Sequence, residues 1–446
     1  MKRKGGCEII AAALYLFERI KAEDIGMIVR KIRPEELKRT KELFAAAFDV
    51  SYDNDKTPEE VYEAACRSPR GREDARPLEK YAAFEDDDRT MTSCISVLHY
   101  PVQFDGSHVE MAGVGEVSSL PQYRRKGGVR ACFEALLPDL YHEGVVFSCL
   151  YPFSTSYYRK FGYEMNAQSC IYEWKLAHIP QWNTKGHCML VDSENALRLL
   201  PDVQRIYGVW QERYNFMVCN EEWEYCFVTE ANPYKTLEYT YVYYGNDGIP
   251  AGFVTFHKEI ADGERILAAT KLVFADPMGF QGLFSLIKGF ASDYSAVRFS
   301  LPEELEIEPF LGELSFDACR RSRRNIGMVR IVNVERALML ARYKGSGELC
   351  IDVRDGQIEE NDGMFHITFE NGRAARVKKL RENSGEQPDL TLPVSEFSRL
   401  LAGAYKTETL PFCNVSLRDG AGWDEETLAS IGQIFYKKPC WLMEGF

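Results

Sequence analysis

The stretch that decides the fold reads Val114-Gly115-Glu116-Val117-Ser118-Ser119-Leu120-Pro121-Gln122-Tyr123-Arg124-Arg125-Lys126-Gly127-Gly128-Val129-Arg130. It begins as a strand, continues as a basic loop with two glycines, and leads into apolar residues at helical spacing. The first N–H groups of a helix are unpaired and attract anions, and glycines let a pyrophosphate come close. The pattern predicts either a pyrophosphate site or a solvated basic turn.

The sequence on both sides predicts an α/β layer around a mixed sheet. The expected strands are 27–33, 80–84, 92–97, 100–104, 109–120 and 145–151, with helices starting at Pro34 and covering about 124–143. The middle of the chain repeats this order, with strands at 237–244, 252–257, 265–274 and 297–302 and a helix at 279–292. The last part predicts a small α+β module, with helices at 334–343 and 395–401 and strands at 347–353, 363–369, 373–377 and 389–392.

At 446 residues the chain has room for about three domains. We predict an N-terminal extension at 1–26, a first domain at 27–180 that opens at Met27, a second at 181–325 and a third at 326–446. The segment from Pro439 to Phe446 is expected to be a tail.

The composition argues against several classes of partner and site. The formal net charge of -13 disfavours nucleic acid as a partner, because phosphate binding needs clustered Lys and Arg. The 13 cysteines form no C-x-x-C pair and have no zinc-type spacing with histidine, which predicts reduced thiols in the cytoplasm and no metal. No apolar run is long enough for a membrane span.

The basic loop resembles the acetyl-CoA signature of the GNAT acetyltransferases, R/Q-x-x-G-x-G/A. Arg124 and Gly127 stand at its first and fourth positions, whereas Val129 replaces the small residue at the sixth. Further along, Leu150-Tyr151-Pro152-Phe153 and Tyr157-Tyr158-Arg159-Lys160-Phe161-Gly162-Tyr163 resemble the Eis (enhanced intracellular survival) family of N-acetyltransferases. The segments 347–353, 389–392 and 400–403 are similar to sterol carrier protein type 2.

This resemblance implies two tandem GNAT-like mixed-sheet domains followed by a small sterol-carrier-like α+β domain. It also implies acetyl transfer from acetyl-CoA to a primary amine of a cationic acceptor: an aminoglycoside, a polyamine or a lysine-like group. Homohexamers are expected by resemblance alone. The cofactor-binding residues carried over are Val117, Ser118, Ser119, Arg124, Arg125, Lys126, Gly127, Gly128, Val129 and Arg130.

Three groups receive catalytic roles from the resemblance. The main-chain N–H of Val117 would stabilise the oxyanion, and Tyr158 would protonate the departing thiolate as general acid. The base would be the chain's own terminal carboxylate, on Phe446. The alternatives are that Tyr158 packs in an aromatic cluster with Tyr157, and that the terminus is frayed.

Glu116 lies beside the expected acetyl position and is either a base or a surface carboxylate. Glu444 is a further acceptor-site candidate, and Asp49, Asp53 and Asp55 lie either at the acceptor pocket or in a solvated loop. The second domain has Asp276-Pro277-Met278-Gly279-Phe280 where the first has its basic loop, which predicts a degenerate copy.

Two other functions compete with N-acetyl transfer. One is a lipid or small-molecule carrier with vestigial acetyltransferase domains, for which Val129 is the best support. The other is transfer of a longer acyl group, which differs only in the donor pocket.

Overall fold

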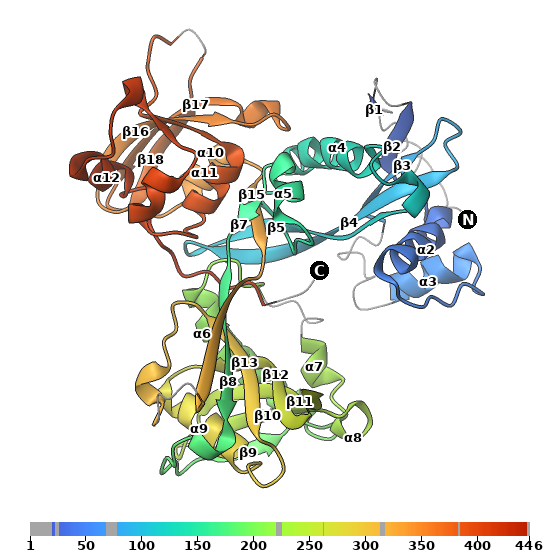
Figure 1. The fold of residues 1–446 in the computed structure, drawn as a ribbon, viewed down its shortest axis with the longest axis vertical. Helices are drawn as coiled ribbons and strands as arrows, with labels where there is room; N and C mark the ends of the chain where they lie inside the picture. The colour runs from blue at the N-terminus through green and yellow to red at the C-terminus, as the bar shows by residue number, and fades with distance from the viewer. Residues whose placement is uncertain are drawn as a thin grey trace, which may run out of the picture.

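The computed structural model describes residues 20–22, 26–67, 78–219, 225–261, 263–312, 317–381 and 384–443. Three mixed sheets organise them (Figure 1), which confirms the predicted fold of two α/β layers followed by a smaller α+β module. The division into domains at the predicted boundaries stays a prediction. None of the helices in these ranges is long and apolar enough to cross a membrane.

The first sheet has the order β1-β2-β3-β4-β5-β6-β15-β7. Its strands are β1 Ile20–Ala22, β2 Met27–Lys31, β3 Lys80–Phe84, β4 Met91–Phe104, β5 Ser107–Ser119, β6 Phe147–Leu150, β7 Glu164–Met165 and β15 Met328–Ile331. Its helical segments are η1 Pro34–Glu36, α2 Leu37–Phe48, α3 Pro58–Arg67, η4 Pro121–Tyr123, α4 Gly128–His142, α5 Thr155–Tyr158 and η5 Arg159–Phe161.

Two expectations for this sheet are wrong in detail. The segments 92–97 and 100–104 form one strand, β4, because Pro101 lies beyond the last β3 pair, Lys80 with Ser96. The long helix begins at Gly128 and not at Arg124, because η4 and a turn with left-handed residues come first.

The second sheet has the order β14-β8-β13-β12-β11-β10-β9. Its strands are β8 Gln168–Lys175, β9 His187–Leu190, β10 Glu238–Tyr244, β11 Pro250–Ala261, β12 Glu264–Phe274, β13 Ala296–Pro302 and β14 Cys319–Asn325. Its helical segments are η6 Leu176–His178, α6 Ala196–Arg213, α7 Cys226–Thr229, α8 Pro233–Thr236, α9 Pro277–Lys288 and η8 Glu308–Phe310.

The third sheet has the order β18-β17-β16-β19-β20. Its strands are β16 Gly347–Arg354, β17 Gly363–Glu370, β18 Arg373–Lys379, β19 Leu390–Pro393 and β20 Ser416–Leu417. The module also contains α10 Val334–Leu340, η9 Glu359–Asn361, α11 Val394–Leu401, η10 Thr407–Phe412, η11 Arg418–Gly420 and α12 Glu425–Ile431.

The chain crosses between these layers more than once. After the second sheet, β15 returns to the first sheet and pairs with both β6 and β7. The core of the third module is continuous with part of the first, since one buried cluster contains Phe104, Phe147, Ile351 and Phe397. The first and third layers therefore share a core, and β15 brings the chain back into the first sheet after the second.

Candidate active site

The first sheet splits where β5 and β6 diverge. These strands pair in parallel only from Met111 with Phe147 to Val114 with Leu150, whereas β5 continues along β4 to Ser119. A register shift lies opposite Cys94–Ser96, and Glu116 there has a φ of 50°. The bulge and the end of the β6 ladder leave the backbone after Val114 without a partner strand on that side. The predicted oxyanion donor, the N–H of Val117, lies in this bulge.

The helix that follows starts without a side-chain cap. Gly127, its N-cap, has a φ of 91°, which only glycine adopts readily, and the first helical bond runs from the N–H of Ala131 to the carbonyl of Gly127. The N–H groups of Gly128, Val129 and Arg130 precede that bond, so they can receive an anion.

The second glycine of the loop, Gly128, is required for packing. A Cβ on Gly128 would lie 2.5 Å from the Ser93 Oγ, so this glycine lets α4 pack closely on β4. The sequence predicts that both glycines let a pyrophosphate approach, whereas the packing of α4 on β4 by itself already requires a glycine at position 128.

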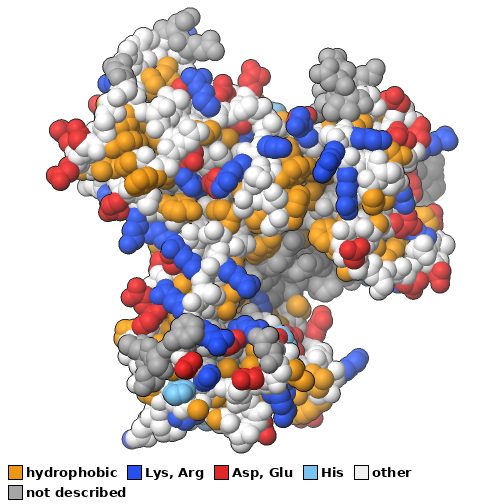
Figure 2. Space-filling model, in the orientation of Figure 1, with side chains coloured by type: hydrophobic (Ala, Val, Ile, Leu, Met, Phe, Trp, Pro, Cys, Tyr) orange, Lys and Arg blue, Asp and Glu red, His pale blue; other side chains and the backbone are white. Residues whose placement is uncertain are grey.

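The basic side chains of the loop are exposed. Arg124, Arg125, Lys126 and Arg130 form no ion pair within the described parts of the chain, and the Lys126 Nζ lies 4.9 Å from the Tyr123 ring centroid. On the face in Figure 2, Lys and Arg side chains gather over and beside α4. Free cations next to an uncapped helix start are the combination that binds phosphate groups.

Tyr158 ends α5 and packs against α4. Its ring centroid lies 6.1 Å from that of Phe133 and 5.3 Å from that of Phe153. Burial raises the pKa of the Tyr158 phenol, and Tyr157 and Tyr163 add to the shift. Among the described residues its hydroxyl makes no hydrogen bond, so its proton is free for a ligand. The aromatic cluster that the sequence predicted as the alternative is present, but the Tyr158 hydroxyl has no hydrogen-bond partner among the described residues.

Phe153 was not singled out from the sequence as a site residue. It follows β6 at the split and is 74% exposed, although its ring contacts Tyr158. Exposed aromatic rings next to a polar site are common contacts for ligands. The motif Leu150-Tyr151-Pro152-Phe153 contains it, but only the tertiary structure shows that its ring lies against Tyr158.

Glu116 is held in an ion-pair cluster. Its carboxylate pairs with Lys80 and with the Lys41 Nζ at 3.4 Å, and it accepts a hydrogen bond from Ser96. Burial alone would raise the pKa of Glu116, but Lys80 and Lys41 outweigh it and hold the pKa at about 2. A carboxylate with so low a pKa is a poor proton acceptor at neutral pH, so this geometry disfavours a base role.

We predict that Glu116→Gln destabilises the fold in a pH-dependent way. Because the folded pKa lies below the ordinary 4.5, the stabilisation is complete above that value and disappears as pH falls towards 2. Urea unfolding at pH 7 should show a loss of about 2 kcal/mol, allowing for partial exposure of the carboxylate. The loss should shrink to less than half by about pH 3, and an equal loss at both pH values would contradict this account. The control is Glu110→Gln, whose side chain is 44% exposed.

The acidic residues after α2 lie in an exposed loop. Asp49 follows the helix with a φ of 54°, and the Asp53 Oδ1 accepts a hydrogen bond from the N–H of Asp55 at 3.2 Å. All three are exposed, which fits the solvated-loop alternative.

The C-terminal segment is buried as far as Leu442. Cys440 and Leu442 enter the core shared by the first and third layers, whereas Trp441 enters the core of the second. Leu442 also abuts Gly327. A Cβ added at Gly327 would lie 3.7 Å from the carbonyl oxygen of Leu150, the last residue of β6. The segment thus runs past the end of β6, next to the split. Glu444 and Phe446 lie outside the described residues.

The second layer has a helix start of the opposite kind. The Asp276 side chain accepts a hydrogen bond from the N–H of Gly279 at 2.8 Å, and Pro277 has no N–H to offer. A Cβ on Gly279 would lie 2.0 Å from the Ala251 carbonyl oxygen. This start is capped by a carboxylate and packed against β11, which excludes a phosphate group and agrees with a degenerate copy.

One cluster has the composition of a metal site. Ligand atoms of Glu79, His99 and Glu143 lie within 4.8 Å of one another. The Lys31 ammonium pairs with both carboxylates, at 3.2 Å to the Glu143 Oε1, and the His99 Nδ1 bonds to Glu110 at 2.7 Å. Because the Lys31 ammonium already pairs with both carboxylates and offsets one of their two charges, we assign no metal to this cluster.

Comparisons with known proteins agree with this geometry. The family model of the acetyltransferase (GNAT) domain matches residues 28–166, and that of the sterol carrier protein domain matches residues 334–443. A search of curated proteins finds no match to the chain.

Solved structures share this fold over most of the chain. A GCN5-related N-acetyltransferase from Anabaena variabilis has a TM-score of 0.77 at 20% identity, over 94% of this chain and 100% of its own. A protein from Enterococcus faecalis labelled "Probable N-Acyltransferase" has a TM-score of 0.76 at 21% identity, with the same coverage. Eis1 from Mycobacterium abscessus has a TM-score of 0.71 at 16% identity, again over 94% and 100%. At these identities the likeness establishes the fold.

The domain match and the local geometry point to the same chemistry. The match at 28–166 covers the split of β5 and β6, the basic loop, α4 and Tyr158. The chain is therefore a GNAT-type acyltransferase that also carries a sterol carrier protein domain.

Proposed function

We propose that the chain is an Eis-like N-acetyltransferase that moves the acetyl group of acetyl-CoA to a primary amine of a cationic acceptor. One observation carries the proposal: the β5–β6 split opens beside the uncapped start of α4, with Tyr158 packed on the same helix. Acetyl-CoA supplies the reactive thioester. The loop from Arg124 to Arg130 would bind its pyrophosphate, and Val117–Ser119 would bind the arm that carries the thioester.

Each catalytic role has a physical basis in this geometry. The Val117 N–H, in a bulge with no partner strand on the β6 side, is suited to stabilise the oxyanion. Tyr158 keeps its proton at neutral pH because burial raises its pKa, so it can protonate the departing thiolate. Neither role needs a metal.

The base in this proposal is the terminal carboxylate of Phe446. It is ionised at neutral pH, since an α-carboxyl group has a pKa of roughly 3.3–3.7, and desolvation in the site would have to raise that pKa for it to accept a proton. Support comes from Leu442, which lies beside the end of β6. Four more residues can extend by at most about 14 Å, a distance that keeps the terminus near the split. Glu444 would lie close enough to attract the acceptor.

The acceptor class rests on charge and resemblance. The net charge of -13 favours cationic ligands, and one structural relative is an Eis protein. Aminoglycosides, polyamines and lysine-like amines all satisfy this chemistry. Cytoplasmic location, a homo-oligomer and the domain boundaries of the sequence analysis belong to the same proposal.

The carrier alternative is disfavoured because the uncapped helix, the exposed cations and Tyr158 are all present. The test is thiol release from acetyl-CoA with a panel of amines, together with mass spectrometry of ligands on the purified protein. Amine-dependent release of CoA supports the proposal. No turnover with any amine, together with retained fatty acid, would overturn it in favour of the carrier.

A further inference from the structure

The tip of the β4–β5 hairpin holds a buried carboxylate. Asp105, with Gly106, makes the turn between the strands, and its side chain is 7% exposed. It pairs with the Lys438 Nζ, and that side chain is 2% exposed. Burial lowers the pKa of Lys438 and Asp105 offsets part of this shift. Removing one partner of such a pair destabilises the fold, because the other charge then stays buried without a partner.

Asp105 also binds the other two layers. Its N–H donates to the Asn215 Oδ1 at 2.9 Å, and its Oδ1 accepts from the Asn215 Nδ2 at 3.0 Å. Its Oδ2 accepts from the N–H of Arg342 at 2.7 Å, just after α10. Four chain segments thus meet on one side chain.

The main chain of Asn215 binds the C-terminal segment. Its N–H donates to the Pro439 carbonyl at 2.9 Å, and its carbonyl accepts from the N–H of Trp441 at 2.9 Å. Asn215 and Cys440 pair as a parallel bridge. Asp105 therefore binds the side chain of Asn215, and the backbone of Asn215 sets the register of residues 439–441. Asp105 also pairs with Lys438, which directly precedes this segment.

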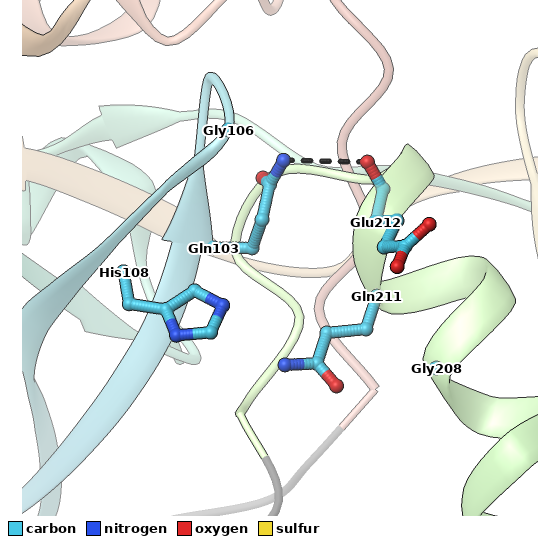
Figure 3. A pocket seen from close by; sticks show the side chains of 6 residues that line it. All are labelled: Gln103, Gly106, His108, Gly208, Gln211 and Glu212. Carbon is cyan, nitrogen blue, oxygen red and sulfur yellow. Dashed lines mark hydrogen bonds between the residues drawn. The ribbon is translucent and has the colours of Figure 1, made fainter.

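The hairpin has other contacts that do not involve this carboxylate. The N–H of Gln103 donates to the Met217 carbonyl, and the N–H of Phe216 donates to the Gln103 carbonyl. The Gln103 Nε2 donates to the Glu212 carbonyl at 3.4 Å, beside a cavity of about 450 Å³ between the hairpin and α6. Figure 3 shows this bond and the side chains that line the cavity. These bonds keep β4 on the second layer without the Asp105 side chain, and the Asp105 carbonyl still accepts from the Arg342 Nε at 2.9 Å. A side-chain change at Asp105 therefore acts first on the C-terminal segment.

We propose that Asp105 is a positioning residue for acetyl transfer: through Lys438 and Asn215 it fixes residues 439–442 and so directs the end of the chain towards the β5–β6 split. The link to catalysis rests on the proposed function, whereas the anchoring of the segment does not. A one-residue slip of an extended segment would move it by about 3.3 Å and exchange the two cores that its side chains enter.

The anchoring is tested by carboxypeptidase digestion followed by mass spectrometry. In the unsubstituted chain, trimming should stop near Met443, because Leu442 and Trp441 are buried. In Asp105→Asn and Lys438→Met chains it should continue past Trp441 at least ten times faster. Glu396→Gln is the matched control, since it breaks a partly buried ion pair with Arg399 inside α11. Trimming in both Asp105 and Lys438 variants that stops where it does in the natural chain would overturn the proposal.

The catalytic link is tested by a double-mutant cycle with a chain that lacks Glu444-Gly445-Phe446. Asp105→Asn should lower kcat at least tenfold with an unchanged KM for acetyl-CoA, and should have no further effect in the shortened chain. Effects that multiply would mean that Asp105 acts on the fold and not through the terminus. If the shortened chain keeps full kcat while Asp105→Asn still releases the segment to carboxypeptidase, the terminal-base proposal fails and the anchoring stands.

Discussion

A chain extended by a few residues beyond Phe446 should turn over acetyl-CoA about 10²- to 10⁴-fold more slowly than the natural chain, the range for loss of a general base. The extension converts the terminal carboxylate into a neutral amide and moves the new charge away. The described fold should survive, since four residues separate Leu442, the last buried residue within the described part of the chain, from the extension. The measurement is kcat by thiol release, with thermal unfolding as a check on the fold.

The control for this experiment is the same extension placed at the N-terminus, which should leave kcat unchanged. Calorimetry should give the same affinity for CoA in both chains, because the basic loop and α4 are untouched. Full activity of the C-terminally extended chain would exclude the terminal carboxylate as base.

Tyr158→Phe should lower kcat by about 10²- to 10⁴-fold. The substitution removes one hydroxyl that makes no hydrogen bond within the described chain and keeps the ring contacts with Phe133 and Phe153. Stability should therefore change little, and the lost rate reflects the missing proton donor. Tyr157→Phe is the matched control, one residue away in the same aromatic cluster. A large loss in that control with little loss at Tyr158 would move the acid to Tyr157.

The pH profile provides a second readout for Tyr158. Because burial raises its pKa above the ordinary value of about 10, the acid stays protonated through the neutral and mildly alkaline range. The natural enzyme should show no alkaline loss of kcat from this group below about pH 10. A loss centred near pH 8 would mean that another group is the acid.

The sequence predicted most of the local structure because its patterns are local. Alternating apolar residues and Asp-Gly or Asn-Gly turns located the strands of the third module to within a few residues, as in β17 and β18. The basic glycine loop predicted the start of the candidate site, and the Asp276-Pro277 sequence predicted a degenerate second copy; both stay predictions. Each of these signals lies within a few neighbouring residues.

The tertiary structure decided what depends on distant residues. Three features join segments that are far apart in the chain. They are the return of β15 between β6 and β7, the ion pairs that make Glu116 a poor base, and the packing that requires Gly128. Lys438 meets Asp105 across 333 residues, and no local pattern records that contact. The amino-acid sequence by itself determined which reactive groups the protein contains. Tertiary packing decided which of those groups can react, because burial and ion pairing set the charge of each group and its access to a ligand.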